Sequence, residues 1–131
     1  MMVVLTFPFS MQLINRSRAD AEAKTIAYML FRQQQDAYAG LQQDSYGIAF
    51  FSDRYTVFTG ERLSDATYQD TYYFTQPIRI SSIQLSVGNE ITFPVGEFRA
   101  GAFGHITISD SRSTYRLEIN SEGMISYYAL D

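Results

Sequence analysis

The sequence predicts an α+β fold, in which one long N-terminal helix, the stem, packs on an antiparallel β-sheet head. In the first third of the chain, apolar residues recur at spacings of three and four, which is the period of one helical face. Beyond residue 41 the period changes to two, in short runs rich in aromatic and β-branched residues. A helix followed by short strands with turn signals between them is typical of an α+β domain.

The predicted stem covers residues 1–40, and we expect it to form one structural domain with the head over 41–131. Pro8 suits the first turn of a helix or a kink within one, because proline lacks an N–H and fixes φ. Gly40 is a natural C-terminal stop. Six residues of the helical face are predicted to pack on the head: Ala23, Ile26, Ala27, Leu30, Ala37 and Tyr38.

Two glutamines lie within this predicted helix. Gln34 interrupts the apolar stripe, and Gln33 belongs to the residues that we assign to a solvated face. The apolar stripe itself must be buried, and one face of the sheet is its expected partner.

The head is predicted to consist of short strands separated by polar turns. Strands are expected over residues 46–51, 55–59, 72–74, 78–83, 84–87, 90–93, 105–109, 114–119 and 124–128. The polar stretch 61–70 is predicted to be a loop.

The charge balance argues against a general nucleic-acid binder. Fourteen acidic and ten basic residues give a net charge of −4, whereas such proteins usually carry a basic stripe. Aromatic residues and arginines can together form a stacking platform for single strands. The head does contain six such arginines: Arg54, Arg62, Arg79, Arg99, Arg112 and Arg116. Acidic residues are interleaved with them, so we consider a nucleic-acid partner the weaker interpretation.

The sequence offers little for catalysis or metal binding. His105 is the only histidine and there is no cysteine, so thiol chemistry, disulfides and zinc sites of the usual kind are excluded. A Ser–His–Asp arrangement would have to use His105, and a lone histidine is a weak signal that is better explained as a strand or loop residue. Asp65, Asp70 and Asp110 do not have the spacing of an EF-hand. We therefore predict no catalytic residues, no metal and no cofactor, and no enzymatic activity.

The order of motifs along the chain resembles a known family. The stretch from Phe7-Pro8-Phe9 through residues 13–18 is similar to the stem of type IV pilin-like proteins, in which a hydrophobic helix runs through a proline into an amphipathic half. The small residues of 37–40, followed by 46–51 and 54–58, resemble the helix end and hairpin of H-type minor pseudopilins and FimT-like minor pilins. Their later turns and strands are similar to residues 91–96, 104–108, 115–120 and 123–125.

The resemblance implies a structural subunit, a minor pilin or pseudopilin, of a type IV pilus-like or type II secretion-like filament. The implied partners are other pilin or pseudopilin subunits, which meet through their N-terminal helices. The implied location is the cell envelope, with the head in the periplasm or outside the cell, or in a surface filament. An N-terminal segment missing from this sequence would anchor the subunit in the inner membrane. The stem residues assigned to assembly are Val3, Val4, Leu5, Phe7, Pro8, Met11 and Ile14.

This sequence departs from the family at its start. The family's processing site, a glycine before an aromatic or apolar residue and a short apolar run ending in glutamate, is absent here. The apolar run 1–9 is about half of the roughly 20 residues that a membrane-spanning helix needs. Only Pro8 is therefore carried over as a family position.

One alternative belongs to a different functional class. A soluble ligand-binding β domain with a packing helix would line a pocket with the aromatic residues and fold the N-terminal run back as a strand. A helix of about 30 residues would be roughly 45 Å long. A head with a radius of about 13 Å is narrower than this helix is long, so part of the helix should protrude. A protruding stem favours the filament subunit.

Overall fold

A computed structural model describes residues 18–40 and 43–130. Helix α2 (Arg18–Ala39) contains 22 residues and carries alanine at its most closely packed positions. It ends where Gly40 adopts a φ of 74° and its N–H donates to the carbonyl of Ala37 at 3.1 Å. Glycine adopts this left-handed conformation without steric cost, and it therefore ends the helix as predicted.

The strands form two antiparallel sheets of four strands each. The first sheet has the order β3-β2-β1-β5 and the second has the order β4-β6-β7-β8. The bounds of the first are β3 (Tyr68–Tyr73), β2 (Arg54–Thr59), β1 (Tyr46–Phe50) and β5 (Glu90–Phe93). Those of the second are β4 (Arg79–Leu85), β6 (Gly104–Ser109), β7 (Thr114–Ile119) and β8 (Ile125–Ala129). A short 3-10 helix, η2 (Leu63–Asp65), precedes β3.

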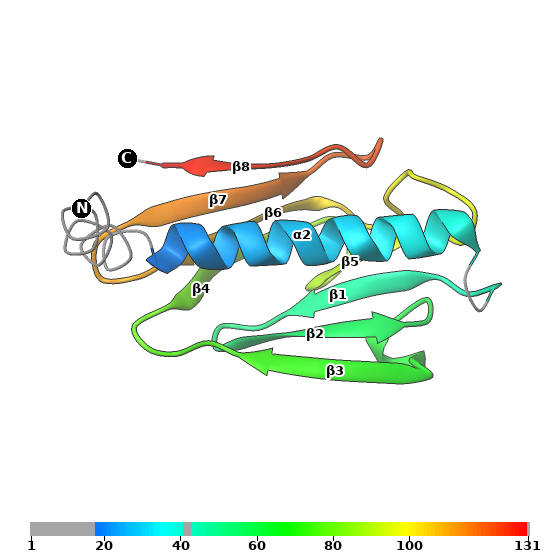
Figure 1. Cartoon of the computed structure of the whole chain (residues 1–131), viewed down its shortest axis with the longest axis horizontal. Helices are drawn as coiled ribbons and strands as arrows, with labels where there is room; N and C mark the ends of the chain where they lie inside the picture. The colour runs from blue at the N-terminus through cyan, green and yellow to red at the C-terminus, as the bar shows by residue number, and fades with distance from the viewer. Residues whose placement is uncertain (1–17, 41–42, 131) are drawn as a thin grey trace, which may run out of the picture.

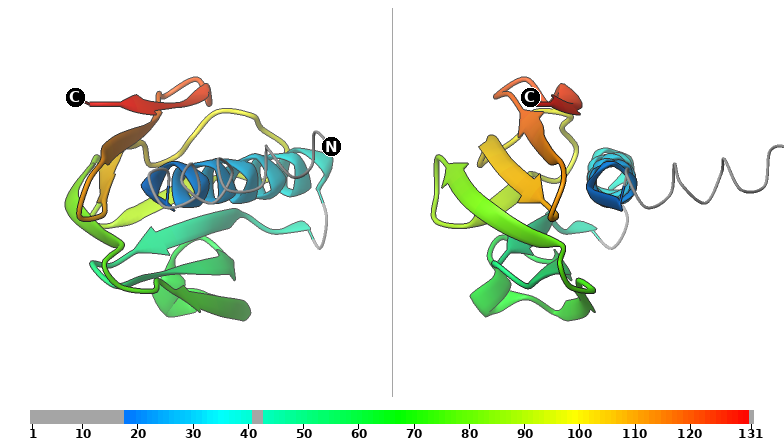
Figure 2. Two further views of the ribbon diagram at one scale, coloured as in Figure 1. Left: turned by 60° about the vertical axis from the view of Figure 1, so that its left-hand side comes forward. Right: turned by 90° about the vertical axis from the view of Figure 1, so that its left-hand side faces the viewer.

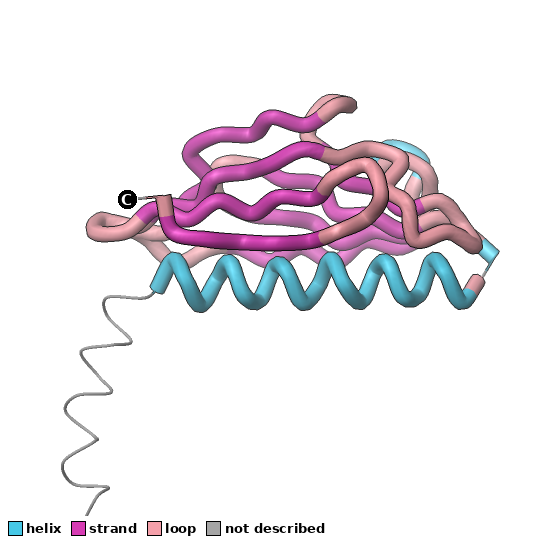
Figure 3. The backbone as a smooth tube through the Cα atoms, turned by 90° about the horizontal axis from the view of Figure 1, so that it is seen from above, coloured by secondary structure: helices cyan, strands magenta, loops and turns pink. Residues whose placement is uncertain are grey.

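Helix α2 lies on one side of the strands, along their length (Figures 1 and 3). Viewed towards one end of α2, the strands form a curved layer beside it (Figure 2, right). The helix contacts β1 and β5 of the first sheet and β6, β7 and β8 of the second. Strand β3 lies beyond the helix, at the far edge of the first sheet (Figure 1).

The core fills the space between α2 and the inner faces of both sheets. Side chains alternate along each strand, so every second residue points towards the helix. The helix contributes Ile26 and Leu30, both completely buried. The fully buried strand residues of this core are Ile48, Phe50, Ile91, Phe93, Ile106, Ile108 and Leu117. Burying each such side chain stabilises the fold by about 1.5–3 kcal/mol, so both sheets depend on the helix for their stability.

The predicted α+β class with a helix packed on antiparallel strands is confirmed. Three details were wrong. The stretch 61–70 is not all loop, because β3 begins at Tyr68. Residues 78–83 and 84–87 do not form two strands but contribute to one, β4, which has a bulge between Ile80 and Ser82. The head also contains two sheets where one was expected, and the helix buries its apolar face against both.

No helix in the described part of the chain combines the length and the apolarity that crossing a bilayer requires.

Candidate assembly surface

The inward face of α2 holds five of the six residues that were predicted to pack on the head. Ala23, Ile26, Leu30 and Ala37 have no exposed surface, and Ala27 is partly buried against the same core. The small alanine side chains allow the helix backbone to approach the strands closely. Leucine and isoleucine fill the remaining space at the density of a protein interior.

Tyr38 was assigned to the same face, and the structure places it at the boundary. Its side chain is 52% exposed, and its ring stacks on that of Phe98 with centroids 4.0 Å apart and planes at 12°. Phe98 lies in the connection between β5 and β6. Tyr38 therefore touches the head through one aromatic contact while much of its surface faces outwards.

Gln33 is buried, contrary to its assignment to a solvated face. It is 6% exposed, and its Nε2 donates to the carbonyls of Gly47 at 2.9 Å and Phe58 at 3.0 Å. These carbonyls belong to the paired strands β1 and β2. The amide is compatible with burial because it is hydrogen-bonded, and it fixes the helix to the first sheet.

Gln34, which was expected to interrupt the stripe, is equally buried at 6%. Its Nε2 donates to the carbonyls of Phe98 at 2.9 Å and Gly123 at 2.8 Å. Gly123 lies in the turn between β7 and β8, so this glutamine ties the helix to the second sheet. Two neighbouring amides thus connect the C-terminal half of α2 to both halves of the head.

The start of α2 is held by a residue distant in sequence. Asp110, in the turn between β6 and β7, accepts a hydrogen bond at 3.1 Å through Oδ2 from the N–H of Ala19. Its Oδ1 accepts from the N–H groups of Arg112 and Ser113, both at 2.7 Å. Burial acts to raise the pKa of Asp110, but these three hydrogen bonds and the nearby Arg18 outweigh it and hold the pKa below its usual value.

The outward face of α2 carries large aromatic side chains, of which the sequence analysis had singled out only Tyr38. Tyr28 is 57% exposed and Phe31 is 50% exposed, and they are three residues apart on one face of the helix. Tyr38 follows Phe31 by two turns. We call Tyr28, Phe31 and Tyr38 the outward aromatic face. The signal that could have identified it is that Tyr28 and Phe31 are out of phase with the stripe that packs on the head.

The predicted stem residues Val3, Val4, Leu5, Phe7, Pro8, Met11 and Ile14 lie outside the described residues.

Three of the arginines considered for a stacking platform form ion pairs within the head. Arg62 Nε lies 3.3 Å from the Oε1 of Glu90, whose side chain is 8% exposed. Arg54 pairs with Asp53 at 2.7 Å and lies 4.3 Å from the ring centre of Phe51. Arg99 pairs with Glu97 at 2.8 Å. These guanidinium groups have acidic partners in place, which weakens their attraction for phosphate.

His105 lies in β6, opposite Glu118 of β7. Its Nδ1 is buried and has no hydrogen-bond partner among the described residues. The described residues contain no group of three or more side chains able to hold a metal ion. Phe50, Phe58 and Phe93 are fully buried and pack against their neighbours, so these aromatic residues do not open onto a pocket.

No protein-family model matches the chain, and no curated protein matches it. A comparison with solved structures finds similarity to the minor pseudopilin EpsH from the Type 2 Secretion System of Vibrio cholerae. The TM-score is 0.59 at 12% sequence identity, and the match covers 85% of this chain and 96% of that one. With its helix lying along antiparallel sheets, the chain therefore has a pilin-like fold.

Proposed function

We propose that this chain is a structural subunit, a minor pilin or pseudopilin, of a type IV pilus-like or type II secretion-like filament. It assembles through its N-terminal helix, without catalysing a reaction. The observation that carries the proposal is the pilin-like fold, matched over 96% of a minor pseudopilin. The outward aromatic face supports it, because exposed aromatic side chains on one helix face are typical of a surface that a partner covers.

In this mechanism the two faces of α2 have different partners. The inward face packs on the subunit's own head, and residues 1–40 and 41–131 act as stem and head of one unit. Tyr28 and Phe31 pack against the helix of a neighbouring subunit, apolar against apolar. The stem residues from Val3 to Ile14 continue this contact, and a preceding segment anchors the subunit in the inner membrane of the cell envelope before assembly.

Cysteine crosslinking in the source cells tests the contact, since the chain has no cysteine of its own. We expect Phe31→Cys to form adducts with other pilin-like subunits, identified by mass spectrometry. Glu122→Cys, at an exposed position in the turn after β7, is the matched control and should form none. Equal crosslinking at both positions, or none at either Tyr28 or Phe31, would refute assembly through this face.

The anchor is tested separately by reading the coding sequence in frame upstream of Met1. A basic leader, a glycine–aromatic junction and an apolar run with glutamate would support membrane anchoring. Unrelated sequence there would contradict the anchor, and a soluble ligand-binding domain would then become the better interpretation.

A further inference from the structure

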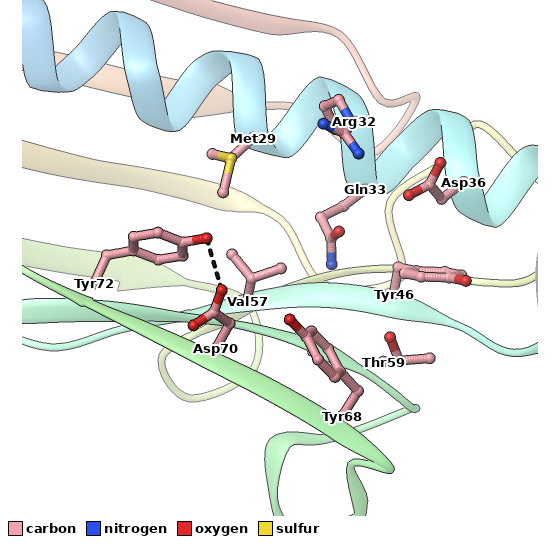
Figure 4. A pocket seen from close by; sticks show the side chains of 10 residues that line it. All are labelled: Met29, Arg32, Gln33, Asp36, Tyr46, Val57, Thr59, Tyr68, Asp70 and Tyr72. Atoms are coloured by element: carbon pink, nitrogen blue, oxygen red, sulfur yellow. Dashed lines mark hydrogen bonds between the residues drawn. The ribbon is translucent and has the colours of Figure 1, made fainter.

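The inner surface of the first sheet extends beyond α2 and leaves a cleft between the helix and β3 (Figure 4). The cleft has a volume of about 370 Å³. Met29, Arg32 and Asp36 line it on the helix side, and Tyr68, Asp70 and Tyr72 line it on the β3 side. None of the three residues of the outward aromatic face lines this cleft, although Arg32 follows Tyr28 by four residues and so adjoins that face.

Strand β3 is the edge of its sheet, and no other described strand pairs with its outer side. All six of its residues are exposed. The N–H of Phe74 donates to the carbonyl of Asp53 at 3.0 Å. In an antiparallel pair every second residue directs its N–H and C=O groups towards the partner strand, and the residues between them direct theirs away. The backbone groups of Gln69, Thr71 and Tyr73 therefore point away from β2. They form a template on which a further strand can be added.

Successive side chains of β3 point to opposite faces of the sheet, and those of Tyr68, Asp70 and Tyr72 face the cleft. The hydroxyl of Tyr72 donates to Asp70 Oδ2 at 2.8 Å, and its ring lies 5.3 Å from that of Tyr55. An inward-pointing charge on an edge strand prevents indiscriminate pairing. Asp70 thus makes the edge selective, because an apolar strand would cover its carboxylate without giving it a partner.

Acidic groups outnumber basic ones around this cleft. Asp36 and Asp70 face it together with a single guanidinium, that of Arg32. Burial and then the nearby Glu22 raise the pKa of Tyr55, and Asp70 contributes to the same shift. A third carboxylate, Glu22, therefore acts on the same group of tyrosines. The local charge favours a cationic ligand.

We propose that the β3 edge and its cleft bind an extended segment of a partner protein that carries basic side chains at alternate positions. The segment adds to β3 as a further strand through the outward backbone groups of Gln69, Thr71 and Tyr73. Its period of two places every second side chain over the cleft. There lysine or arginine stems lie against Tyr68 and Tyr72, and their charged ends reach Asp36 and Asp70.

A second copy of this chain is the competing occupant. Two β3 edges could pair, but the second copy would bring its own Asp36 and Asp70 to a region that is already acidic. A basic segment neutralises these carboxylates, which is why charge complementarity favours it.

The probe is a blocked, fluorescently labelled peptide of about eight residues, which is within the usual range of strand lengths, and in it lysine alternates with threonine. Anisotropy at low and physiological salt should show binding that weakens as salt rises. The same peptide with glutamate in place of lysine should not bind. Amide hydrogen exchange should slow at Gln69, Thr71 and Tyr73 when the lysine peptide is present.

Variants separate charge from strand addition. The double variant Asp36→Asn/Asp70→Asn should weaken binding by roughly tenfold or more, and Arg32→Gln should strengthen it. Glu122→Gln removes one exposed carboxylate away from the cleft and should leave binding unchanged. Gln69→Pro removes an outward N–H without touching the bonds to β2 and should abolish binding, whereas Gln69→Ala should retain it.

Three results would overturn the assignment. Equal affinity for the glutamate peptide would show that charge plays no part. Undiminished binding to Gln69→Pro would show that no strand is added. A dimer of the protein alone that Gln69→Pro disrupts, found by sedimentation, would show that a second copy occupies the edge.

Discussion

The inward and outward faces of α2 both carry large apolar side chains, but these differ in how deeply they are buried. Leu30 has no exposed surface, while its neighbour Phe31 is half exposed. Both are large and apolar, but only Leu30 belongs to the core formed with the two sheets. The contrast teaches that one helix serves two purposes. Its inward face stabilises the protein, and its outward face exposes Tyr28 and Phe31 to solvent.

The largest expected effect breaks the inward face. Leu30→Ala should lower the free energy of unfolding by about 2–5 kcal/mol, because it leaves a cavity between helix and sheets. Phe31→Ala should change it by no more than about 0.5 kcal/mol, since half of the ring is already in water. Urea unfolding of the two variants measures both values.

Assembly should depend on the outward residue of this pair, Phe31, although stability depends mainly on Leu30. In the crosslinking experiment, Phe31→Ala should reduce adducts formed through Tyr28→Cys, although its stability is unchanged. A destabilisation by Phe31→Ala as large as that by Leu30→Ala would contradict the separation of the two faces.

The next effect concerns the buried amides. Gln34→Ala removes two hydrogen bonds and leaves the carbonyls of Phe98 and Gly123 without this donor. A loss of about 1–3 kcal/mol in the free energy of unfolding is expected, since buried polar groups are costly to leave unpaired. Gln35→Ala, one position further along and only partly buried, is the control and should be close to neutral. Similar losses of stability in both variants would show that the substitutions act through helix propensity and not through the hydrogen bonds of Gln34.

The burial of these amides could not be predicted from the sequence. The positions of Ile26 and Leu30 follow from hydrophobic periodicity, which depends only on local spacing. The partners of Gln34 lie 64 and 89 residues away, and no local pattern reveals them. Gln34 was therefore interpreted as an interruption of the apolar stripe, and Gln33 was assigned to a solvated face. The hydrogen bonds of both amides nevertheless allow them to be buried.

Only the end of strand β3 was predicted, as a strand over residues 72–74, and its first residues were assigned to a loop for a related reason. All its residues are exposed, so there is no alternation of buried and exposed positions to signal a strand. The cleft beside it also depends on how far the sheet extends past the helix, which is a tertiary property. By contrast β5 (Glu90–Phe93), in which the apolar Ile91 and Phe93 alternate with polar residues, has the bounds that its sequence predicts.

A smaller, pH-dependent effect on stability is expected from Asp110, which binds the N–H of Ala19 at the start of α2. The pKa of Asp110 is lowered in the folded state, so its contribution is present above the unfolded pKa of about 3.9 and is lost as the pH falls through the lower, folded value. Asp110→Ala should therefore cost about 1 kcal/mol at pH 7, as loss of a helix cap does, and progressively less in acid. Unfolding measured from pH 7 down to about pH 2 tests this.

The comparison must be made between variant and parent at each pH. Burial raises the pKa of Glu22, so protonation of Glu22 favours the folded state and acts in the opposite direction. Asp53→Ala, which removes an exposed carboxylate paired only with Arg54 among the described contacts, is the control. A constant cost of Asp110→Ala across the pH range would contradict a role for its charge.

The smallest expected effect lies where the two faces meet. Tyr38 and Phe98 stack but are 52% and 42% exposed, so their coupling should be near the lower end of the range for aromatic pairs, about 0.5 kcal/mol. A double-mutant cycle with Tyr38→Ala and Phe98→Ala measures it in the isolated protein. If a neighbouring subunit covers the outward aromatic face, the ring of Tyr38 becomes buried against both partners. The cost of Tyr38→Ala should then be larger in the assembled filament than in the free subunit. An equal cost in both would place Tyr38 outside the contact and confine the assembly surface to Tyr28 and Phe31.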